Sequence, residues 1–264
     1  MTHRLLSRPL SWAGTLVFLP VFGAILLVFD VAQRIARLFG QRPQEYVAGA
    51  LQVALVWSFR LCNTRLLVER APGVRPWTSY IVVSNHQSMF DIPILGALLF
   101  SNFPKYVSKR ELGRGIPSVS YNLRRGGNCL IDRGDAEQAL GAIRTLGERV
   151  ERNGVSAVIF PEGTRARAGA LGAFKPRGSL VLLAAAPLTA IVPVAIDQSW
   201  RLMRANFLPI PFGVRVRVHI GDPIRRRPDE DHAELLDRVH DEIAAALAVM
   251  RGETVEPRRL AAAH

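Results

Sequence analysis

The N-terminal part of the chain contains a run of 18 residues without a charged side chain, from Trp12 to Phe29. Arg4 and Arg8 precede this run. As an α-helix it would be about 27 Å long, close to the lower limit for crossing the hydrocarbon core of a bilayer. Pro20 lies in its middle and is expected to kink the helix. The run therefore predicts a membrane-seeking segment attached to a globular body.

A second apolar stretch, residues 46–59, is shorter and is interrupted by Gln52. Basic residues flank the first run and separate the two runs, so the positive-inside rule selects no orientation. Two marginal helices fit a re-entrant or interfacial hairpin as well as a true span. A signal peptide is the alternative, but no small-x-small cleavage site follows the first run. We expect residues 1–62 to form a membrane-associated two-helix motif.

From residue 63 onward, short β-branched runs alternate with amphipathic segments. The predicted strands and helices are a strand at 79–84, a helix at 136–152, a strand at 155–160, a helix at 180–186, strands at 190–196 and 214–220, and a helix at 233–251. Strands that alternate with helices are typical of an α/β sheet. Residues 63–264 are therefore expected to form one α/β domain, with a mixed central sheet flanked by helices.

The net charge of the chain is +12 and its isoelectric point is about 11.0, so its partners are expected to be anionic. Lipid headgroups, phosphorylated substrates and acidic carrier proteins fit this charge. Nucleic acid also fits it, but the sequence has no RNP-like aromatic pattern and no zinc-finger spacing, so we expect no nucleic-acid partner. The cysteines, Cys62 and Cys129, form no CxxC pair and predict no disulfide framework.

The first predicted strand is followed by the heptapeptide NHQSMFD, residues 85–91. A histidine beside a carboxylate can act as a general base, because the acid fixes its tautomer and stabilises the imidazolium. On a regular helix the five-residue separation of His86 and Asp91 would place them about 140° apart. They can meet only if His86 lies in the turn before a helix and Asp91 in its first turn, where Pro93 is tolerated. A helix start with an incidental histidine is the other interpretation.

The predicted strand at 155–160 leads into the hexapeptide FPEGTR, residues 160–165. Gly163 lets backbone N–H groups approach a ligand, Thr164 offers a hydroxyl, and Arg165 offers a guanidinium fork that suits a phosphate. Glu162 could orient Arg165 or a substrate. A simple turn is the alternative interpretation of this motif.

The tetrapeptide LIDR, residues 130–133, follows a Gly-Gly pair. An apolar run that ends in Asp-Arg predicts a strand that presents Arg133 at its end. Taken by itself, a surface ion pair is the simpler interpretation.

In this order, the motifs resemble sequence blocks of the lysophosphatidic acid acyltransferase family, the bacterial PlsC-like glycerolipid acyltransferases. NHQSMFD looks like the family's His-x4-Asp block, LIDR like its second block, and FPEGTR like its phosphate-binding block. Residues 192–194, VPV, look like the fourth block. The segment VSKREL, residues 107–112, resembles the stretch before the second block, with Lys109 near its basic position. The resemblance covers about residues 65–225.

This resemblance implies transfer of a fatty-acyl group from acyl-CoA or acyl-carrier protein to the free hydroxyl of 1-acylglycerol 3-phosphate, giving phosphatidic acid. His86 and Asp91 carry over as the catalytic dyad, and backbone donors after the Gln87–Ser88 turn are candidates for binding an oxyanion. The expected substrate-binding residues are Lys109, Arg133, Glu162, Gly163, Thr164 and Arg165.

The same resemblance implies a lysophospholipid acceptor, an anionic membrane surface, and a place at the cytoplasmic membrane with the catalytic domain on the cytoplasmic face. Because the thioester is already activated, no metal and no other cofactor is expected. Two segments depart from the family pattern, residues 113–115 and the Pro176-Arg177 step, and both could shape the substrate pocket. Lyso-ornithine lipid or glycerol 3-phosphate therefore stay open as acceptors.

Other classes of function have weaker support. A serine hydrolase would need a Gly-x-Ser-x-Gly elbow, which the chain lacks, and a zinc hydrolase is disfavoured because the six histidines show no His-x3-His spacing. A non-catalytic basic protein that binds membranes is the remaining alternative, and only the charge favours it.

Overall fold

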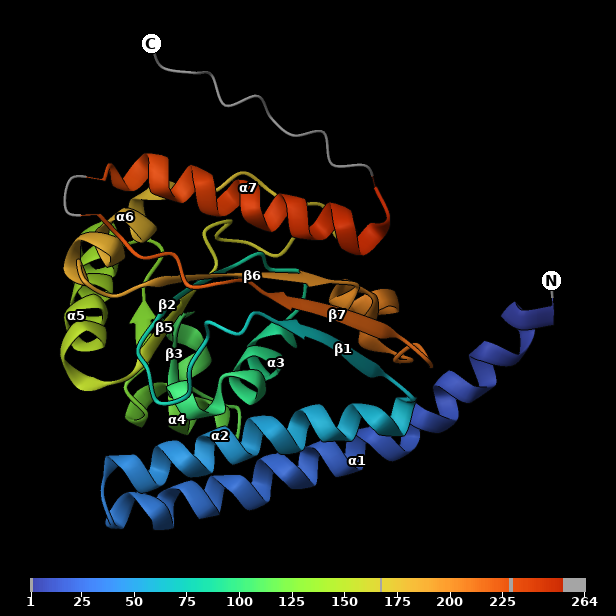
Figure 1. Cartoon of the computed structure of the whole chain (residues 1–264). Coiled ribbons are helices and arrows are strands. Elements are labelled where there is room, and N and C mark those ends of the chain that lie inside the picture. The colour runs from blue at the N-terminus through green and yellow to red at the C-terminus, as the bar shows by residue number, and fades with distance from the viewer. Residues whose placement is uncertain (1, 167, 228–229, 254–264) are drawn as a thin grey trace.

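A mixed seven-stranded β-sheet lies at the centre of the protein, and helices cover both of its faces (Figure 1). This computed structural model describes residues 2–166, 168–227 and 230–253. The architecture confirms the predicted α/β fold with a mixed central sheet flanked by helices and an apolar helix at the N-terminus.

The strands are β1 (Arg65–Arg70), β2 (Ile81–Ser84), β3 (Pro104–Lys109), β4 (Cys129–Ile131), β5 (Ser156–Ile159), β6 (Ile191–Asp197) and β7 (Arg215–Ile220). Their order in the sheet is β1-β7-β6-β2-β5-β3-β4. Strands β6, β2, β5, β3 and β4 run parallel to one another, whereas β7 pairs antiparallel with β6 and parallel with β1. The carboxyl ends of five strands therefore meet at one edge of the sheet.

The α-helices are α1 (Thr2–Leu38), α2 (Gln41–Ser58), α3 (Asp91–Leu98), α4 (Val119–Arg125), α5 (Ala136–Asn153), α6 (Pro176–Ala185) and α7 (His232–Arg251). Short 3-10 helices are η1 (Phe59–Cys62), η2 (Phe100–Asn102), η3 (Arg110–Gly113) and η4 (Ser199–Phe207). The Pro176-Arg177 step begins α6, because the fixed φ of proline suits the first helical turn.

Two apolar clusters pack on the opposite faces of the sheet. Along β2, Val82 belongs to the cluster that includes Phe18 of α1 and Leu95 of α3. Its neighbours Ile81 and Val83 belong to the cluster formed with α5, α6 and α7. Successive side chains of a strand point to opposite faces, so a strand buried on both sides consists of apolar residues throughout. This explains the uninterrupted Ile-Val-Val run before the NHQSMFD motif.

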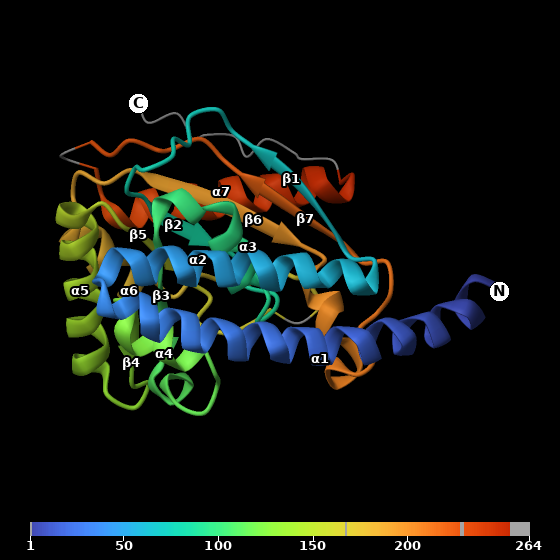
Figure 2. The same cartoon turned by 90° about the horizontal axis from the view of Figure 1, so that it is seen from below.

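Helices α1 and α2 form a long hairpin beneath the sheet (Figures 1 and 2). α1 continues as one helix through Pro20. A Cβ atom at Gly14 would lie 3.0 Å from the carbonyl oxygen of Leu61, so glycine allows α1 to approach the body of the domain closely. Further along, the Ser118 hydroxyl donates to the carbonyl of Leu26 at 2.7 Å. One side of α1 is thus attached to the domain along much of its length.

The other side of α1 is apolar and exposed. Leu16, Leu27 and Val28 are 66%, 61% and 64% exposed. Among the described residues, α1 over residues 8–38 is the one helix long and apolar enough, by length and composition, to cross a membrane. Only 11% of its most apolar 18-residue window is buried inside the protein. This face is the structural basis for the predicted membrane-seeking segment.

A buried ion cluster connects α2 to the sheet. The Lys105 ammonium of β3 lies 2.8 Å from Glu45 of α2, and Arg42 and Arg149 contact the same carboxylate at 3.1 and 3.5 Å. Glu45 and Lys105 are only 5% and 4% exposed. Burial lowers the pKa of Lys105 to about 8, although Glu45 opposes this shift. The cluster fixes the position of α2 relative to the sheet, because a buried charge without its counter-charge would be costly.

Replacing Lys105 with methionine should destabilise the protein by about 3–5 kcal/mol, because Glu45 would lose its closest counter-charge while staying buried. Equilibrium denaturation of the detergent-solubilised protein would measure the change. The double variant Lys105→Met/Glu45→Gln should recover part of the loss. Arg152→Met, which removes an exposed ion pair with Glu148 on α5, is the control and should cost no more than about 1 kcal/mol. Equal effects of the two single variants would contradict the cluster's role.

Candidate active site

The predicted site residues gather at the edge of the sheet where the five parallel strands end. The NHQSMFD turn follows β2, the FPEGTR turn follows β5, Lys109 ends β3, and Arg133 follows β4. In open α/β sheets, ligands bind in the crevice beyond the carboxyl ends of the strands. The topology thus brings together motifs that are far apart in the sequence.

The imidazole of His86 and the carboxylate of Asp91 are in contact. His86 Nδ1 lies 2.8 Å from Asp91 Oδ2. His86 occupies the turn before α3 and Asp91 is the first residue of that helix, the arrangement that their five-residue separation requires. The backbone N–H groups of Gln87 and Ser88 donate to the same Oδ2 at 2.7 and 2.8 Å. The Asp91 side chain, which is completely buried, therefore holds the whole turn around it.

These two backbone donors are consequently not available to an oxyanion. The predicted oxyanion donors are those after the Gln87–Ser88 turn, and two of these, the N–H groups of Phe90 and Asp91, are engaged as well. Phe90 N donates to Ser88 Oγ at 3.2 Å, and Asp91 N donates to Ser88 O at 3.1 Å. These donors stabilise the conformation of the turn itself.

The His86 ring is fixed from a second direction by Phe160. The two rings stack with centroids 4.2 Å apart and an interplanar angle of 19°. The His86 side chain is 17% exposed, so the ring is held in place but still accessible. Because Nδ1 faces Asp91, Nε2 is the ring nitrogen left for a ligand. None of the described residues forms a hydrogen bond with it.

Asn85 anchors the start of the turn to the neighbouring strand. Its Nδ2 donates to the carbonyl of Ile196, and its Oδ1 accepts from the Ile196 N–H, each at 2.8 Å. The side-chain amide thereby pairs with the backbone of β6 just where β2 has ended. Sequence reasoning had noted Asn85 only as part of the motif. Its partner is 111 positions away, so no local pattern could indicate the contact.

Glu162 joins the two turns. Its Oε1 accepts the backbone N–H of His86 at 2.8 Å, and its Oε2 accepts that of Gly172 at 3.0 Å. Burial raises the pKa of the Glu162 carboxyl, although these backbone donors oppose the shift. Each carboxylate oxygen thus accepts a backbone hydrogen bond. Glu162 is only 4% exposed, so its position suits fixing the backbone of His86, and the expected contact with a substrate stays a prediction.

The cationic residues lie on the rim of the site. Lys109, Arg133 and Arg165 are all exposed. Arg133 Nη2 donates to the carbonyl of Gly163 at 2.8 Å, whereas Arg165 Nη1 lies 3.4 Å from the sulfur of Met203 in η4. The two guanidinium groups therefore contact different parts of the rim.

The FPEGTR turn offers its remaining groups to the outside. Gly163 has a φ of +68°, a conformation that favours glycine, and this allows the chain to turn back at the rim. Thr164 is exposed beside it. Within the described part of the chain, no group of three or more His, Cys, Asp or Glu side chains could hold a metal ion.

Ser199 contacts Asp91, and the sequence analysis did not predict this contact. It is the first residue of η4, two positions after the end of β6, and its hydroxyl donates to Asp91 Oδ1 at 2.5 Å. No motif surrounds it, and 108 residues separate it from Asp91. Only the fold identifies it as part of the site.

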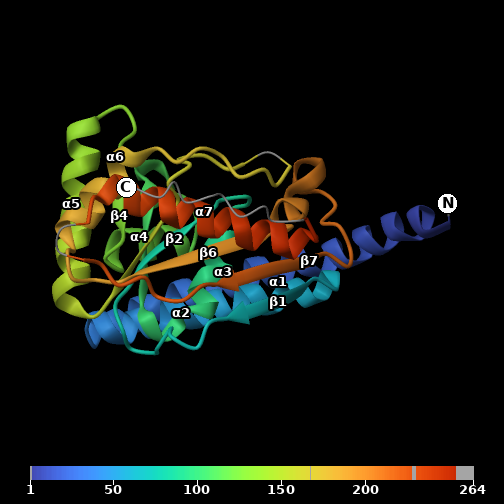
Figure 3. The ribbon, with the colours of Figure 1, turned by 45° about the horizontal axis from the view of Figure 1, so that its top comes forward.

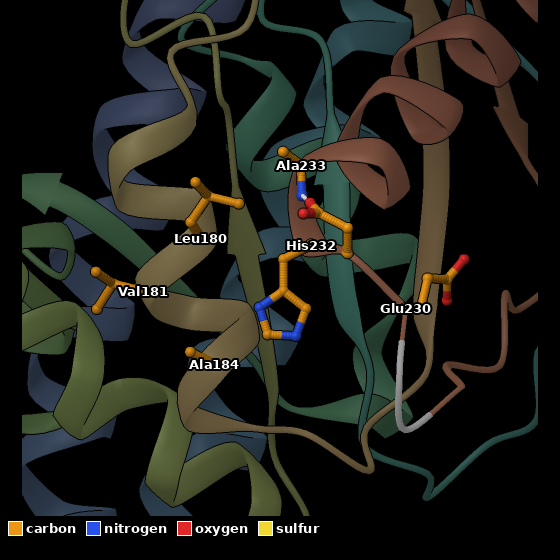
Figure 4. Close-up of a pocket in the computed structure, with 7 residues that line it drawn as sticks. Leu180, Val181, Ala184, Glu230, His232 and Ala233 are labelled. Carbon is orange, nitrogen blue, oxygen red and sulfur yellow. Dashed lines mark hydrogen bonds between the residues drawn. The ribbon is translucent and has the colours of Figure 1, made fainter.

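Two recesses elsewhere on the surface contain none of these residues. One, of about 510 Å³, lies between α6 and the start of α7, and Leu180, Ala184 and His232 are among the residues that line it (Figure 4). The other, of about 390 Å³, lies between α1 and the start of α4, beside Arg34 and Tyr121. The chemistry of the site therefore belongs to the strand-end edge and not to these recesses.

Comparison with known proteins supports one family. A family model described as Acyltransferase matches residues 67–197. The lyso-ornithine lipid O-acyltransferase of Pseudomonas aeruginosa is 32% identical over 185 residues, which are 69% of this chain and 68% of that protein. The 1-acyl-sn-glycerol-3-phosphate acyltransferase of Helicobacter pylori is 39% identical over 89 residues, 34% of this chain and 36% of that protein. The human 1-acyl-sn-glycerol-3-phosphate acyltransferase beta is 36% identical over 140 residues, 53% of this chain and 46% of that protein.

A solved structure shares the fold. The crystal structure of the 1-acyl-sn-glycerophosphate acyltransferase PlsC from Thermotoga maritima superposes with a TM-score of 0.75. The match covers 96% of this chain and 99% of that one, at 20% sequence identity. The likeness therefore includes the N-terminal helices as well as the sheet.

Proposed function

Because this chain belongs to the acyltransferase family, we propose that it moves a fatty-acyl group from acyl-CoA or acyl-carrier protein to the free hydroxyl of 1-acylglycerol 3-phosphate, giving phosphatidic acid. The observation that carries the proposal is the 2.8 Å contact between His86 Nδ1 and Asp91 Oδ2 at the strand-end edge. The contact leaves Nε2 accessible beside a rim of exposed cations.

In the proposed mechanism His86 is the general base. Its Nε2 takes the proton of the acceptor hydroxyl as that oxygen attacks the thioester carbonyl. Asp91 keeps the Nδ1–H tautomer in place and stabilises the imidazolium that forms. When the carbon–sulfur bond breaks, His86 returns the proton to the leaving thiolate. The thioester is already activated, so the chain needs no covalent acyl-enzyme.

The rim places the acceptor. We assign the binding of its phosphate to Lys109, Arg133 and Arg165, with the exposed Thr164 hydroxyl beside them. The predicted role of Gly163 becomes that of shaping the turn, because its N–H donates to the carbonyl of Phe160 at 3.0 Å and its carbonyl accepts from Arg133 at 2.8 Å. Holding the phosphate fixes the hydroxyl near Nε2, which is a proximity effect. Guanidinium groups suit a phosphate because they offer paired N–H donors.

A second acceptor has specific support. The lyso-ornithine lipid O-acyltransferase of Pseudomonas aeruginosa, which is similar over 69% of this chain, is named as acting on that lipid. An ornithine headgroup carries an amine and a carboxylate instead of a phosphate. The exposed cations of the rim favour the phosphate, so we place 1-acylglycerol 3-phosphate first.

A product assay tests the function. Purified protein would be incubated with acyl-CoA or acyl-carrier protein and with either 1-acylglycerol 3-phosphate or lyso-ornithine lipid. The products would be identified by mass spectrometry. We expect phosphatidic acid from the wild-type protein. His86→Ala should lower turnover by about 10²- to 10⁴-fold while circular dichroism shows an unchanged fold. Turnover of His86→Ala near the wild-type rate would exclude His86 as the base. Acylation of lyso-ornithine lipid alone would show that this lipid, and not 1-acylglycerol 3-phosphate, is the acceptor.

Arg165→Ala should raise KM for 1-acylglycerol 3-phosphate about tenfold or more, because a hydrogen bond to a charged group is lost. KM for the acyl donor should stay the same. Arg144→Ala, which removes an exposed arginine of α5, is the matched control and should change neither constant. Initial-rate kinetics with each substrate varied separately would decide. An effect confined to the donor would contradict the assigned role of Arg165.

We also propose that the exposed face of α1 holds the protein at the cytoplasmic membrane, with the strand-end edge on the cytoplasmic side. Deleting residues 1–62 is a poor test, because Phe18 of α1 lies within the core. The triple variant Leu16→Gln/Leu27→Gln/Val28→Gln changes only exposed positions of this helix. When vesicles of phosphatidylethanolamine and phosphatidylglycerol are sedimented, this variant should stay in the supernatant, because each replacement reduces the apolar protein surface that can insert into the lipid.

Leu188→Gln/Val249→Gln is the control for this experiment, because both positions are exposed and lie outside the hairpin. The control should still pellet with the vesicles. Retention of the triple variant on the vesicles would argue against α1 as the anchor.

A further inference from the structure

A buried hydroxyl outside the family's motifs contacts the carboxylate of the proposed dyad. Ser199 is completely buried, and its Oγ lies 2.5 Å from Asp91 Oδ1. A carboxylate only accepts hydrogen bonds, so the serine hydroxyl is the donor. Hydrogen bonds to charged groups are short and roughly twice as strong as neutral ones.

The two oxygens of Asp91 have different surroundings. Oδ2 accepts from His86 Nδ1 and from the backbone of Gln87 and Ser88. Of the described residues, Ser199 is the one whose hydrogen bond reaches Oδ1. All three donors to Oδ2 belong to the turn just before Asp91, within five positions of it in the sequence. Ser199 belongs to a different element, the helix η4 that follows β6. The carboxylate plane is therefore fixed by donors from two independent elements.

We propose that Ser199 is a positioning residue for the acyl transfer. Its hydroxyl holds the carboxylate plane so that Oδ2 stays directed at His86 Nδ1 while the imidazole gains and returns its proton. This inference rests on the proposed function, in which His86 is the base. Ser199 acts through Asp91 and, by this assignment, has no contact with substrate. Losing it should reduce the rate of the chemical step and leave substrate binding unchanged.

The turn that carries Ser199 is itself held in place. Asp197, the last residue of β6, accepts a hydrogen bond from Arg251 at 2.9 Å, and Arg251 also donates to the carbonyl of Gly169 at 2.6 Å. Arg251 is the last residue of α7, which runs across the sheet along β6 (Figure 3). Gln198, between Asp197 and Ser199, has a φ of +69°, which a non-glycine residue adopts only where its surroundings require it. The hydroxyl is thus presented by a rigid turn.

Ser156 offers a matched control. It is also completely buried, and its Oγ accepts the backbone N–H of Tyr80 at 3.1 Å. It begins β5, at the edge of the sheet opposite to the site. Ser156→Ala therefore removes an equally buried serine hydroxyl and its hydrogen bond without touching the dyad.

The experiment compares Ser199→Ala, Ser156→Ala and His86→Ala with the wild-type protein. Ser199→Ala should lower kcat by about 10- to 100-fold, the size of effect expected when a hydrogen bond to a charged group is lost from the transition state, with KM of both substrates unchanged. Ser156→Ala should keep the wild-type kcat. In protein labelled with ¹⁵N-histidine, the Nδ1–H proton of His86, assigned by its absence from His86→Ala, should shift in Ser199→Ala and stay in place in Ser156→Ala.

Ser199→Cys covers the case in which Ser199→Ala does not fold, because it leaves no cavity at this buried position and offers only a weak donor. The same separation of kcat from KM is expected. If His86→Ala is inactive while the Ser199 variants keep the wild-type kcat and an unshifted proton, the inference is overturned and the proposed function stands. An equal loss of kcat in Ser156→Ala also overturns it. If His86→Ala is active, the proposed function with His86 as the base is itself contradicted.

Discussion

The Asp91 carboxylate is the group on which the geometry of the site depends. It is completely buried at the start of α3, away from the water that would otherwise solvate its charge. The protein replaces that water with the His86 imidazole, two backbone N–H groups and the Ser199 hydroxyl. These donors come from the turn after β2 and the turn after β6. Satisfying one buried charge therefore fixes the histidine, the helix start and the neighbouring strand end relative to one another.

The rest of the fold supports this edge. Glu162 ties the FPEGTR turn to the backbone of His86, so this turn and the histidine are held together. On one face of the sheet, the α1–α2 hairpin packs through Phe18 and the Glu45–Lys105 pair, while α1 keeps an apolar side exposed. Under the proposed function this arrangement is useful, because a rigidly attached apolar helix can hold the strand-end edge at a lipid surface.

Local sequence patterns predicted the repeating parts of the fold and the short-range half of the site. The apolar run of β2, the amphipathic period of α5 and the spacing of His86 and Asp91 all act within one element or one turn. Strands β1 and β3 and helix α4 were not predicted. β1 is mostly exposed and begins and ends with charged residues, β3 is interrupted by polar residues, and α4 spans only seven residues, so none of them shows a clear apolar pattern. The contacts of Ser199 and of Glu45 join residues far apart in the sequence. A buried Glu45 also contradicts the usual expectation that a charged residue on a helix faces solvent.

The central claim is that His86 Nε2 receives the proton of the acceptor hydroxyl. A crystal structure of the protein with bound 1-acylglycerol 3-phosphate tests this most directly, through the distance between that hydroxyl oxygen and Nε2. The account predicts a hydrogen bond of about 2.6–3.2 Å, with the phosphate among the cations of the rim. A hydroxyl out of reach of Nε2 while the phosphate occupies the rim would contradict it.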